Sequence, residues 1–204
     1  YEGEELGMTN AHFTKLEQYR DLEALNGYRQ RVEEAKCQSS ESMMAALALI
    51  GRDNARTPMQ WDASKYAGFT PADAAAEPWI SVNPNHVEIN AAEEFDDPDS
   101  VYTFYKKLIA MRHNSATIST GEWHLLAADS DQVYAFTRTN GDDTILVVVN
   151  LTDRSAELPA DVAELLSDGV SEPQVLLSTY DAMRSVKSIA RGELARWEGV
   201  VIQL

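Results

Sequence analysis

The spacing of the apolar residues changes near residue 117, and this change limits the folds that the chain can adopt. Before it, apolar residues recur every third or fourth position, as in Phe104 and Leu108, which is the spacing of one helix face. After it, apolar and polar residues alternate, as in Gln132–Thr139, which is typical of half-buried strands. The sequence therefore predicts a helical first part, residues 1–117, and an antiparallel sheet domain in residues 118–204.

The second part contains several runs with strand character and one strong turn signal. Asn140-Gly141-Asp142 separates two of these runs and is typical of a tight hairpin. Residues 159–169 predict a connecting loop or a short helix. The number and length of the runs favour an antiparallel β-sandwich. The predicted strands are Glu122–Ala128, Gln132–Thr139, Thr144–Leu151, Gln174–Ser178 and Gly199–Leu204.

The first part divides into two helical regions separated by a long irregular segment. Residues 11–50 have helical periodicity with a break at Gln38-Ser39-Ser40, where a serine suits a helix N-cap. Residues 52–97 have no clear periodicity and predict one long excursion. Asp97-Pro98-Asp99-Ser100 then predicts a helix start, with Asp97 as cap and proline at the first position. The aromatic residues of that helix are predicted to lie in a core.

The segment Arg52–Asp62 (RDNARTPMQWD) carries the densest polar chemistry of the chain. Its lack of periodicity and its proline predict a loop. A guanidinium can donate paired hydrogen bonds to vicinal hydroxyls or carboxylates, and the Trp61 indole offers an apolar wall. The alternative is a surface loop held by Arg–Asp ion pairs. Spacing alone leaves both readings open.

Composition excludes several classes of partner. The 204 residues carry a net charge of −16, which disfavours nucleic acid and anionic membranes, because phosphate backbones require a basic patch. No apolar segment is long enough to span a bilayer. Cys37 is the single cysteine, so no intrachain disulfide is possible, which fits a cytoplasmic location. The four histidines lack ligand spacing, so neither a metal nor a cofactor is expected.

Four motifs in order resemble the α-glucosidase and oligo-1,6-glucosidase branch of glycoside hydrolase family 13. The resemblance covers the whole chain and implies that it is a C-terminal portion. Residues 1–117 would be the last strand and helices of a (β/α)8 catalytic barrel, and residues 118–204 the β-sandwich domain that follows it. The motifs are Tyr1–Asn10 (YEGEELGMTN), Tyr19–Glu23 (YRDLE), Arg52–Trp61 (RDNARTPMQW) and Pro78–Asn90 (PWISVNPNHVEIN).

The resemblance also implies roles for individual residues. The catalytic carboxylates of this family lie on earlier barrel strands, so no catalytic residue is expected in this chain. Arg56 would contact the glucose at the cleavage point, and Glu4 or Glu5 the next sugar. If the chain is extended there, the two glutamates point to opposite sides, and Glu4 is favoured. Glu2 stands where the family usually has glutamine.

The same resemblance implies supporting roles elsewhere in the arginine-rich segment. Arg52 and Asp53 are expected to brace the loop. Trp61 is expected to be loop core rather than a substrate wall, and Trp79 with Ile80 is expected to anchor the long excursion.

Three functions remain open from the sequence. The first is a retaining α-glucosidase that removes terminal glucose from short oligosaccharides, with the rest of the barrel upstream and this chain inactive alone. The second is a sucrose isomerase or transglycosylase on the same scaffold. The third is a non-catalytic carbohydrate-binding module, in which Trp123, Tyr134 and Phe136 would have to be exposed.

Overall fold

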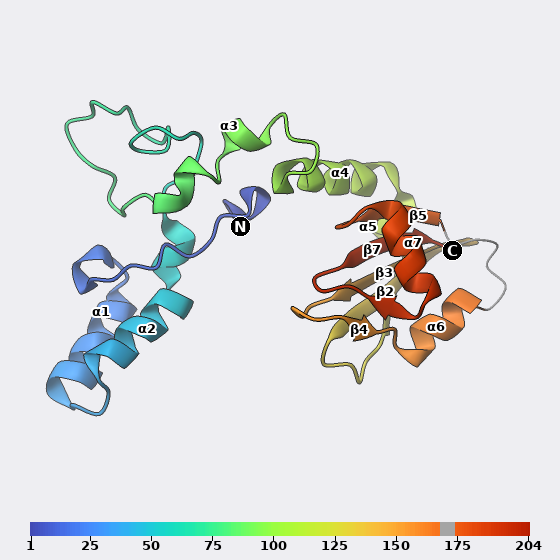
Figure 1. The fold of residues 1–204 in the computed structure, drawn as a ribbon. Coiled ribbons are helices and arrows are strands. Elements are labelled where there is room, and N and C mark those ends of the chain that lie inside the picture. The colour runs from blue at the N-terminus through green and yellow to red at the C-terminus, as the bar shows by residue number, and fades with distance from the viewer. Residues whose placement is uncertain (168–173) are drawn as a thin grey trace. The chain divides into compact units, whose positions relative to one another are not determined.

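The computed structural model describes residues 1–167 and 174–204, and its contacts divide the chain into two units (Figure 1). Unit 1 is Tyr1–Lys106 and unit 2 is Lys107–Leu204. The division falls within one helix, and the domain boundary expected at residues 117/118 stays a prediction. Each unit is described by itself.

Unit 1 is built from helices and long loops, and no strand occurs in residues 1–106. Its helices are α1 (Leu22–Tyr28), which continues as a π-helical segment Arg29–Glu34, α2 (Ser40–Ile50), α3 (Ala91–Glu94) and the beginning of α4 (Val101–Asn114). Its 3-10 turns are Glu4–Leu6, Leu16–Gln18, Arg52–Arg56 and Pro84–Val87. The helical first part is therefore confirmed, although residues 11–21 contain only one short turn.

Side-chain caps set the starts of the two longer helices of the first half. The Asp21 carboxylate accepts a hydrogen bond from the Ala24 N–H at 3.3 Å and begins α1. The Ser39 hydroxyl accepts from the Ser42 N–H at 3.1 Å and begins α2, as the predicted break requires. Both caps satisfy N–H groups that have no partner within the helix.

Two predicted starts differ from the structure. Residues 1–10, expected to hold the end of the last barrel strand and the loop after it, form a 3-10 turn at Glu4–Leu6 instead of a strand end. Its N-cap Gly3 has φ 96°, and a Cβ added to Gly3 would lie 2.7 Å from the Met8 sulfur. A strand needs a neighbouring ladder, and unit 1 supplies none. The helix expected from Asp97 begins instead at Val101, because the Ser100 hydroxyl accepts from the Thr103 N–H at 3.1 Å.

The core of unit 1 joins the N-terminal segment to α1 and α2. Phe13 and Tyr19 meet edge to face, with ring centroids 5.5 Å apart. No residue of α4 is buried, since the side chains of this chain cover its apolar face only in part. The aromatic residues of α4 therefore do not lie in a core, contrary to the prediction. The buried core residues are Ala11, Phe13, Tyr19, Ala24, Met43, Leu47 and Ile80.

Buried amides hold the long excursion against the rest of unit 1. Asn83 donates to the Thr9 carbonyl at 2.8 Å, a contact between residues 74 positions apart. Asn90 donates to the His86 carbonyl at 2.9 Å, and Gln60 is fully buried. The excursion thus has a defined path despite its lack of regular structure, as expected for a long loop held in place.

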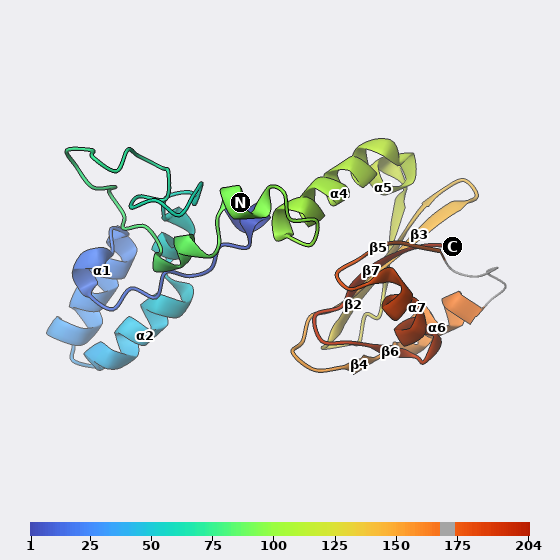
Figure 2. The same cartoon turned by 45° about the horizontal axis from the view of Figure 1, so that its top comes forward.

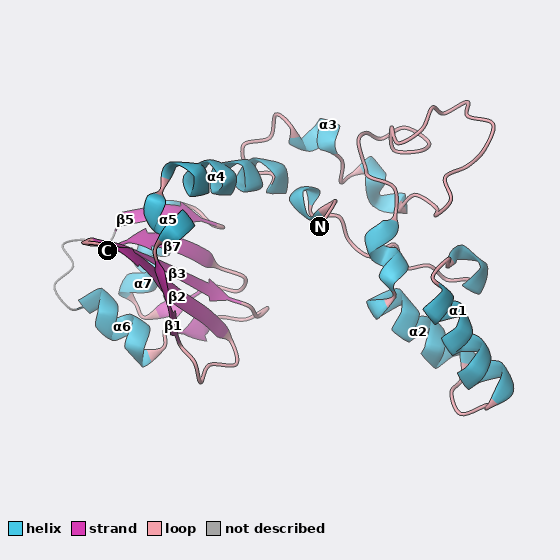
Figure 3. Cartoon of the chain, turned by 180° about the vertical axis from the view of Figure 1, so that it is seen from behind, coloured by secondary structure: helices cyan, strands magenta, loops and turns pink. Residues whose placement is uncertain are grey.

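Unit 2 contains a five-stranded antiparallel sheet with strand order β1-β2-β3-β7-β5 (Figure 3). Gly141 has φ 62° in the tight turn between β2 and β3, which confirms the hairpin. The strands are β1 (Glu122–Leu126), β2 (Val133–Asn140), β3 (Asp143–Asn150), β5 (Gln174–Ser178) and β7 (Gly199–Gln203). All five agree with the predicted runs to within two residues.

The second layer of unit 2 combines a small sheet with two helices. Strands β4 (Ala156–Glu157) and β6 (Glu193–Leu194) pair with each other, and α6 (Ala160–Ser167) and α7 (Ala182–Ala190) cover the same face of the large sheet. Helix α7 lies in front of the strands in Figure 1, and α6 and α7 are seen from a second angle in Figure 2. The second sheet has two strands and is accompanied by helices, and α6 lies in the segment predicted as a connecting loop or short helix. Gly169, the end of that segment, lies outside the described residues.

The central strand β3 carries the core of unit 2. Val148 pairs with Ala135 on β2 and with Val200 on β7, and all three are buried. Asn150 at the end of β3 is fully buried, and its amide donates to the Arg154 carbonyl at 2.7 Å. The Asn150 side chain thus fixes the end of β3 through a hydrogen bond in the interior of unit 2.

The short helix α5 (Ala116–Thr120) is tied to the sheet by one buried side chain. The Thr117 hydroxyl donates to the Asp143 carboxylate, and Thr117 is buried. We expect Thr117→Val to lower the free energy of unfolding by about 1.5–3 kcal/mol, the range for a hydrogen bond to a charged group. Urea denaturation of the 204-residue chain measures it.

Thr120→Val provides the matched control. Thr120 is exposed, and its hydroxyl bonds only to the Ala116 carbonyl of its own helix at 2.9 Å. Equal losses for the two variants would contradict a specific role for the Thr117–Asp143 contact.

Candidate functional site

Two neighbouring cavities in unit 1 bring the N-terminal motif against the arginine-rich segment. Their volumes are about 350 and 380 Å³. Tyr1, Glu2, Met8, Ala55 and Thr57 line both. The first is completed by Arg56, Pro58, Met59, Phe69, Pro78, Trp79 and Ile80. Three of the four sequence motifs therefore meet around this cavity.

Asp53 is the buried centre of the contacts that hold the arginine-rich segment. It is 0% exposed, and one of its carboxylate oxygens accepts from the backbone N–H groups of Arg20 and Asp21, at 2.6 and 2.8 Å. Its other oxygen lies 3.4 Å from Arg56 Nη1. A buried carboxylate needs this compensation, since an unpaired charge there would be strongly destabilising. The expected bracing role of Asp53 is confirmed.

Asp21 is the second acceptor and receives both arginines of the segment. Arg52 reaches it with two contacts, Nη2 to Oδ1 at 2.9 Å and Nε to Oδ2 at 3.3 Å. Arg52 also pairs with the exposed Glu23 at 2.9 Å. Arg52 therefore braces the loop, as expected, with the forked geometry typical of arginine and carboxylate.

Arg56 combines an ion-paired side with an open side. Its Nη1 lies 3.3 Å from Asp21 Oδ1 and 3.4 Å from Asp53 Oδ1. Its side chain is nevertheless 38% exposed and lines the first cavity. A guanidinium has five N–H donors, so donors remain for a ligand after these two contacts. Arg56 therefore braces the loop through its ion pairs, and this role does not prevent it from binding a ligand.

This charge arrangement shifts two pKa values. Burial by itself raises the pKa of Asp21, but hydrogen bonds from the Ala24 N–H and from Arg52 and Arg56 bring it below its ordinary value. Burial and the nearby Asp53 carboxylate raise the pKa of Tyr19. Asp21 is thus held as a carboxylate, which preserves its attraction for both arginines.

The two glutamates of the first motif occupy different positions. Glu4 lines the second cavity. Glu5 Oε2 accepts from the Gly3 N–H at 2.9 Å. Both lie in a 3-10 turn, so the argument from alternating directions in an extended chain does not apply. Which glutamate faces a ligand stays a prediction.

Two tryptophans expected inside the fold are on its surface. Trp61 is 52% exposed and Trp79 69% exposed, so neither is loop core. Ile80 next to Trp79 is buried, as expected, and belongs to the core of unit 1. An amphipathic indole on the rim of a polar cavity offers a flat apolar surface, and Trp79 is positioned in this way beside Arg56.

The sequence motifs contained two further residues whose position only the structure gives. Asp21 was present in the second motif without an assigned role and accepts from both arginines. Glu2 lines both cavities and brings a negative charge to the rim. The described residues contain no group of three or more His, Cys, Asp or Glu side chains arranged to hold a metal ion. None of their helices has the length and apolar character to cross a bilayer.

A separate aromatic cluster lies on unit 2. The ring centroids of Trp123 and Phe136 are 6.5 Å apart, and those of Tyr134 and Phe136 are 5.6 Å apart. Trp123 and Tyr134 are about half exposed. The exposure that a carbohydrate-binding module would require is present for these two residues, while the rings are tilted to one another rather than coplanar.

Comparison with known proteins gives matches along both units. Residues 1–121 match the family model of the α-amylase catalytic domain, and residues 123–170 that of the maltogenic amylase C-terminal domain. The chain is 41% identical over 183 residues to an oligo-1,6-glucosidase of Bacillus cereus, covering 89% of this chain and 31% of that protein. It is 52% identical over 141 residues to an alpha-glucosidase of Pediococcus pentosaceus, covering 69% and 24%.

Solved structures resemble the chain over its whole length. A trehalose-6-phosphate hydrolase of Bacillus licheniformis matches with a TM-score of 0.80 and 34% identity, covering 100% of this chain and 35% of that one. A mutant of the trehalulose synthase MutB in complex with Tris matches with a TM-score of 0.80 and 37% identity, with the same coverage. The chain spans about a third of the length of these proteins.

The family match covers more than half of the chain and agrees with the motifs, the helical unit 1 and the antiparallel sheet of unit 2. The chain therefore belongs to glycoside hydrolase family 13, the α-amylase family, and comprises the C-terminal part of its catalytic domain followed by a C-terminal domain.

Proposed function

We propose that this chain supplies part of the substrate-binding wall of a retaining α-glucosidase that removes terminal glucose from short oligosaccharides. The observation that carries the proposal is Arg56, a partly exposed guanidinium lining a cavity together with the N-terminal motif. The 41% identity to an oligo-1,6-glucosidase supports the choice of activity. Retaining enzymes use two carboxyl groups about 5–5.5 Å apart, and by the family resemblance both are supplied from outside this chain.

In this proposal the residues of this chain bind and orient the sugar. Arg56 donates to two neighbouring hydroxyls of the glucose at the cleavage point. Asp21 and Asp53 hold the other side of the Arg56 guanidinium. Glu4 or Glu5 accepts from a hydroxyl of the next sugar. Holding the sugar in one orientation lowers the entropic cost of reaching the transition state.

An isomerase or transglycosylase acting on sucrose is the second candidate. The observation favouring it is the 37% identity to a trehalulose synthase over the full chain. Incubating the full-length enzyme with isomaltose, maltose and sucrose, and separating the products by chromatography, decides between the two. Free glucose from isomaltose supports the hydrolase, and an isomer of sucrose as the main product supports the alternative.

We predict that the 204-residue chain by itself does not hydrolyse p-nitrophenyl α-glucoside or isomaltose. The physical reason is that, by resemblance, the catalytic carboxylates are supplied by another part of the barrel. Release of p-nitrophenol measures it, with the full-length enzyme as positive control. Turnover that persists through repeated purification would disprove the prediction.

Arg56→Ala in the full-length enzyme should lower kcat/KM by about 10- to 200-fold, because a charge-assisted hydrogen bond contributes about 1.5–3 kcal/mol. Arg56→Lys should recover only part of this, since an ammonium cannot copy the fork. The matched control is Arg52→Ala, which should lower the melting temperature more than the turnover. If Arg56→Ala keeps a near-normal kcat/KM, Arg56 only braces the loop. The same conclusion follows if its kcat/KM falls only together with its melting temperature.

Asp21 should make stability depend on pH. Because its folded pKa is below the ordinary value of 3.8, its stabilising effect is fully present above that value and is lost as pH falls through the folded pKa. Asp21→Asn in the full-length enzyme should therefore cost about 1–3 kcal/mol at pH 7 and progressively less as the pH falls below 3.8.

Denaturant unfolding at several pH values tests this. Glu23→Gln is the control, since Glu23 also pairs with Arg52 but is 82% exposed, and exposed pairs contribute little. A cost of Asp21→Asn that is independent of pH would be inconsistent with the ion-pair explanation.

A further inference from the structure

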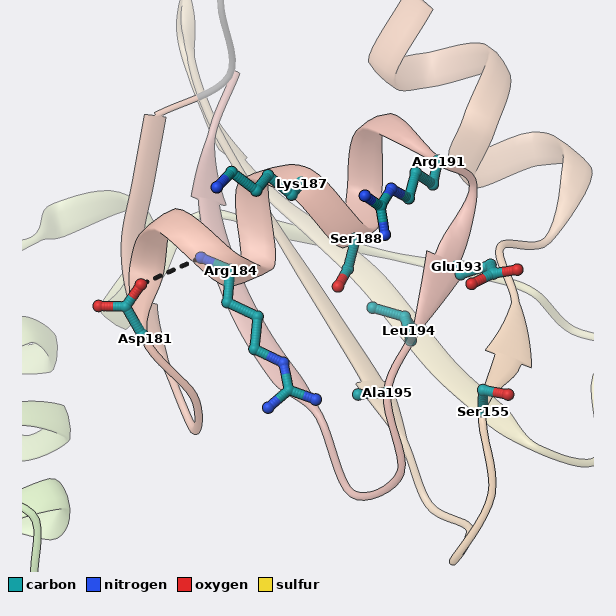
Figure 4. A pocket seen from close by; sticks show the side chains of 9 residues that line it. All are labelled: Ser155, Asp181, Arg184, Lys187, Ser188, Arg191, Glu193, Leu194 and Ala195. Carbon is teal, nitrogen blue, oxygen red and sulfur yellow. Dashed lines mark hydrogen bonds between the residues drawn. The ribbon is translucent and has the colours of Figure 1, made fainter.

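A cavity of about 470 Å³ in unit 2 lies between α7, β6 and the residue preceding β4. Its lining brings together three cationic side chains and two hydroxyl groups. Figure 4 shows the side chains of Arg184 and Lys187 on α7 and of Arg191 directly after it, with the Ser188 hydroxyl between the two guanidinium groups in that view. Ser155 contributes the second hydroxyl.

This cluster is unusual in so acidic a chain. Residues 184–191 contain three of the 17 Lys and Arg residues and no Asp or Glu, while the whole chain has a net charge of −16. Positions three, four and seven residues apart share one helix face, and like charges at such spacing destabilise a helix. None of the six ion pairs found among the described residues involves these three cations.

Two acidic side chains also line the cavity, and neither takes part in the six ion pairs found among the described residues. The Asp181 carboxylate accepts from the Arg184 backbone N–H at 3.1 Å and serves as the N-cap of α7. Glu193 lies at the cavity wall, and its carboxylate points away from Ser188 in Figure 4. The cavity lining therefore carries three cationic side chains against two acidic ones.

Arg184 is held in place by an aromatic ring. Its guanidinium carbon lies 4.1 Å from the centroid of the Tyr180 ring, and the Tyr180 hydroxyl donates to the Arg196 carbonyl at 2.9 Å. A stacked guanidinium keeps its edge free for hydrogen bonds in its plane. Fixing it in advance reduces the entropy lost when a ligand binds.

From this geometry we propose that the cavity binds the phosphate group of a small ligand, either inorganic phosphate or a phosphorylated sugar. Two guanidinium forks, one ammonium and two hydroxyls match a tetrahedral oxyanion that carries more than one charge. A carboxylate would satisfy only one fork. The volume is within the range of small-ligand pockets. The site is independent of Arg56 and of the proposed glucosidase activity.

Isothermal titration of the 204-residue chain at constant ionic strength tests the proposal, with inorganic phosphate, glucose 6-phosphate and glucose as separate titrants. Saturable binding of both phosphate compounds, and none of glucose, is expected. Arg184→Ala and Arg191→Ala should each weaken binding at least about tenfold. Arg196→Ala removes an exposed arginine that does not line the cavity and should change binding less than about twofold.

The two sources of phosphate are distinguished by their affinities. Glucose 6-phosphate binding about tenfold tighter than inorganic phosphate identifies a phosphorylated sugar, and equal affinities identify inorganic phosphate. Lys187→Gln and Arg191→Gln, with circular dichroism as a check of folding, replace the Arg184 variant if the loss of its Tyr180 contact unfolds the chain. The absence of saturable phosphate binding, or equal losses in the pocket variants and in Arg196→Ala, overturns the proposal and leaves a solvated basic face.

Discussion

The buried carboxylate of Asp53 is the constraint on which the arrangement of unit 1 depends. It is fully buried and accepts from the N–H groups of Arg20 and Asp21, which fixes the segment before α1 against the arginine-rich turn. Asp21 then receives Arg52 and Arg56 from that same turn. Removing a single partner would leave a buried charge uncompensated, so the network forms as a set. Two motifs 30 or more positions apart are joined by this electrostatic requirement.

The same network explains how a loop can offer a charged group to a ligand. A free arginine loses much side-chain entropy on binding, whereas Arg56 is already held on one side by Asp21 and Asp53. Its other side lines a cavity with Tyr1, Glu2 and the exposed Trp79. Bracing and binding are therefore compatible roles of one side chain, and the ion pairs supply the rigidity that recognition of a sugar would require.

The core of unit 2 lies between one large sheet and a second layer that combines a small sheet with two helices. The buried residues of β3 are apolar up to Val148, while buried polar groups such as Asn150 lie where elements meet. Glu198, fully buried, accepts from the Ser185 hydroxyl of α7 at 2.5 Å and from the Ala195 N–H at 2.6 Å. This contact holds α7 on the sheet by its inner side. The basic residues of the helix are left on the outer side, toward the cavity between α7 and β6.

The sequence by itself determined the local elements and the family. Strand-like runs of apolar residues predicted β1, β2, β3, β5 and β7, and the break at Gln38-Ser39-Ser40 predicted the start of α2. Only the tertiary structure decided the surface positions of Trp61 and Trp79 and the role of Asp21. These features depend on contacts between residues far apart in the chain, and the local spacing of residue types does not reveal such contacts.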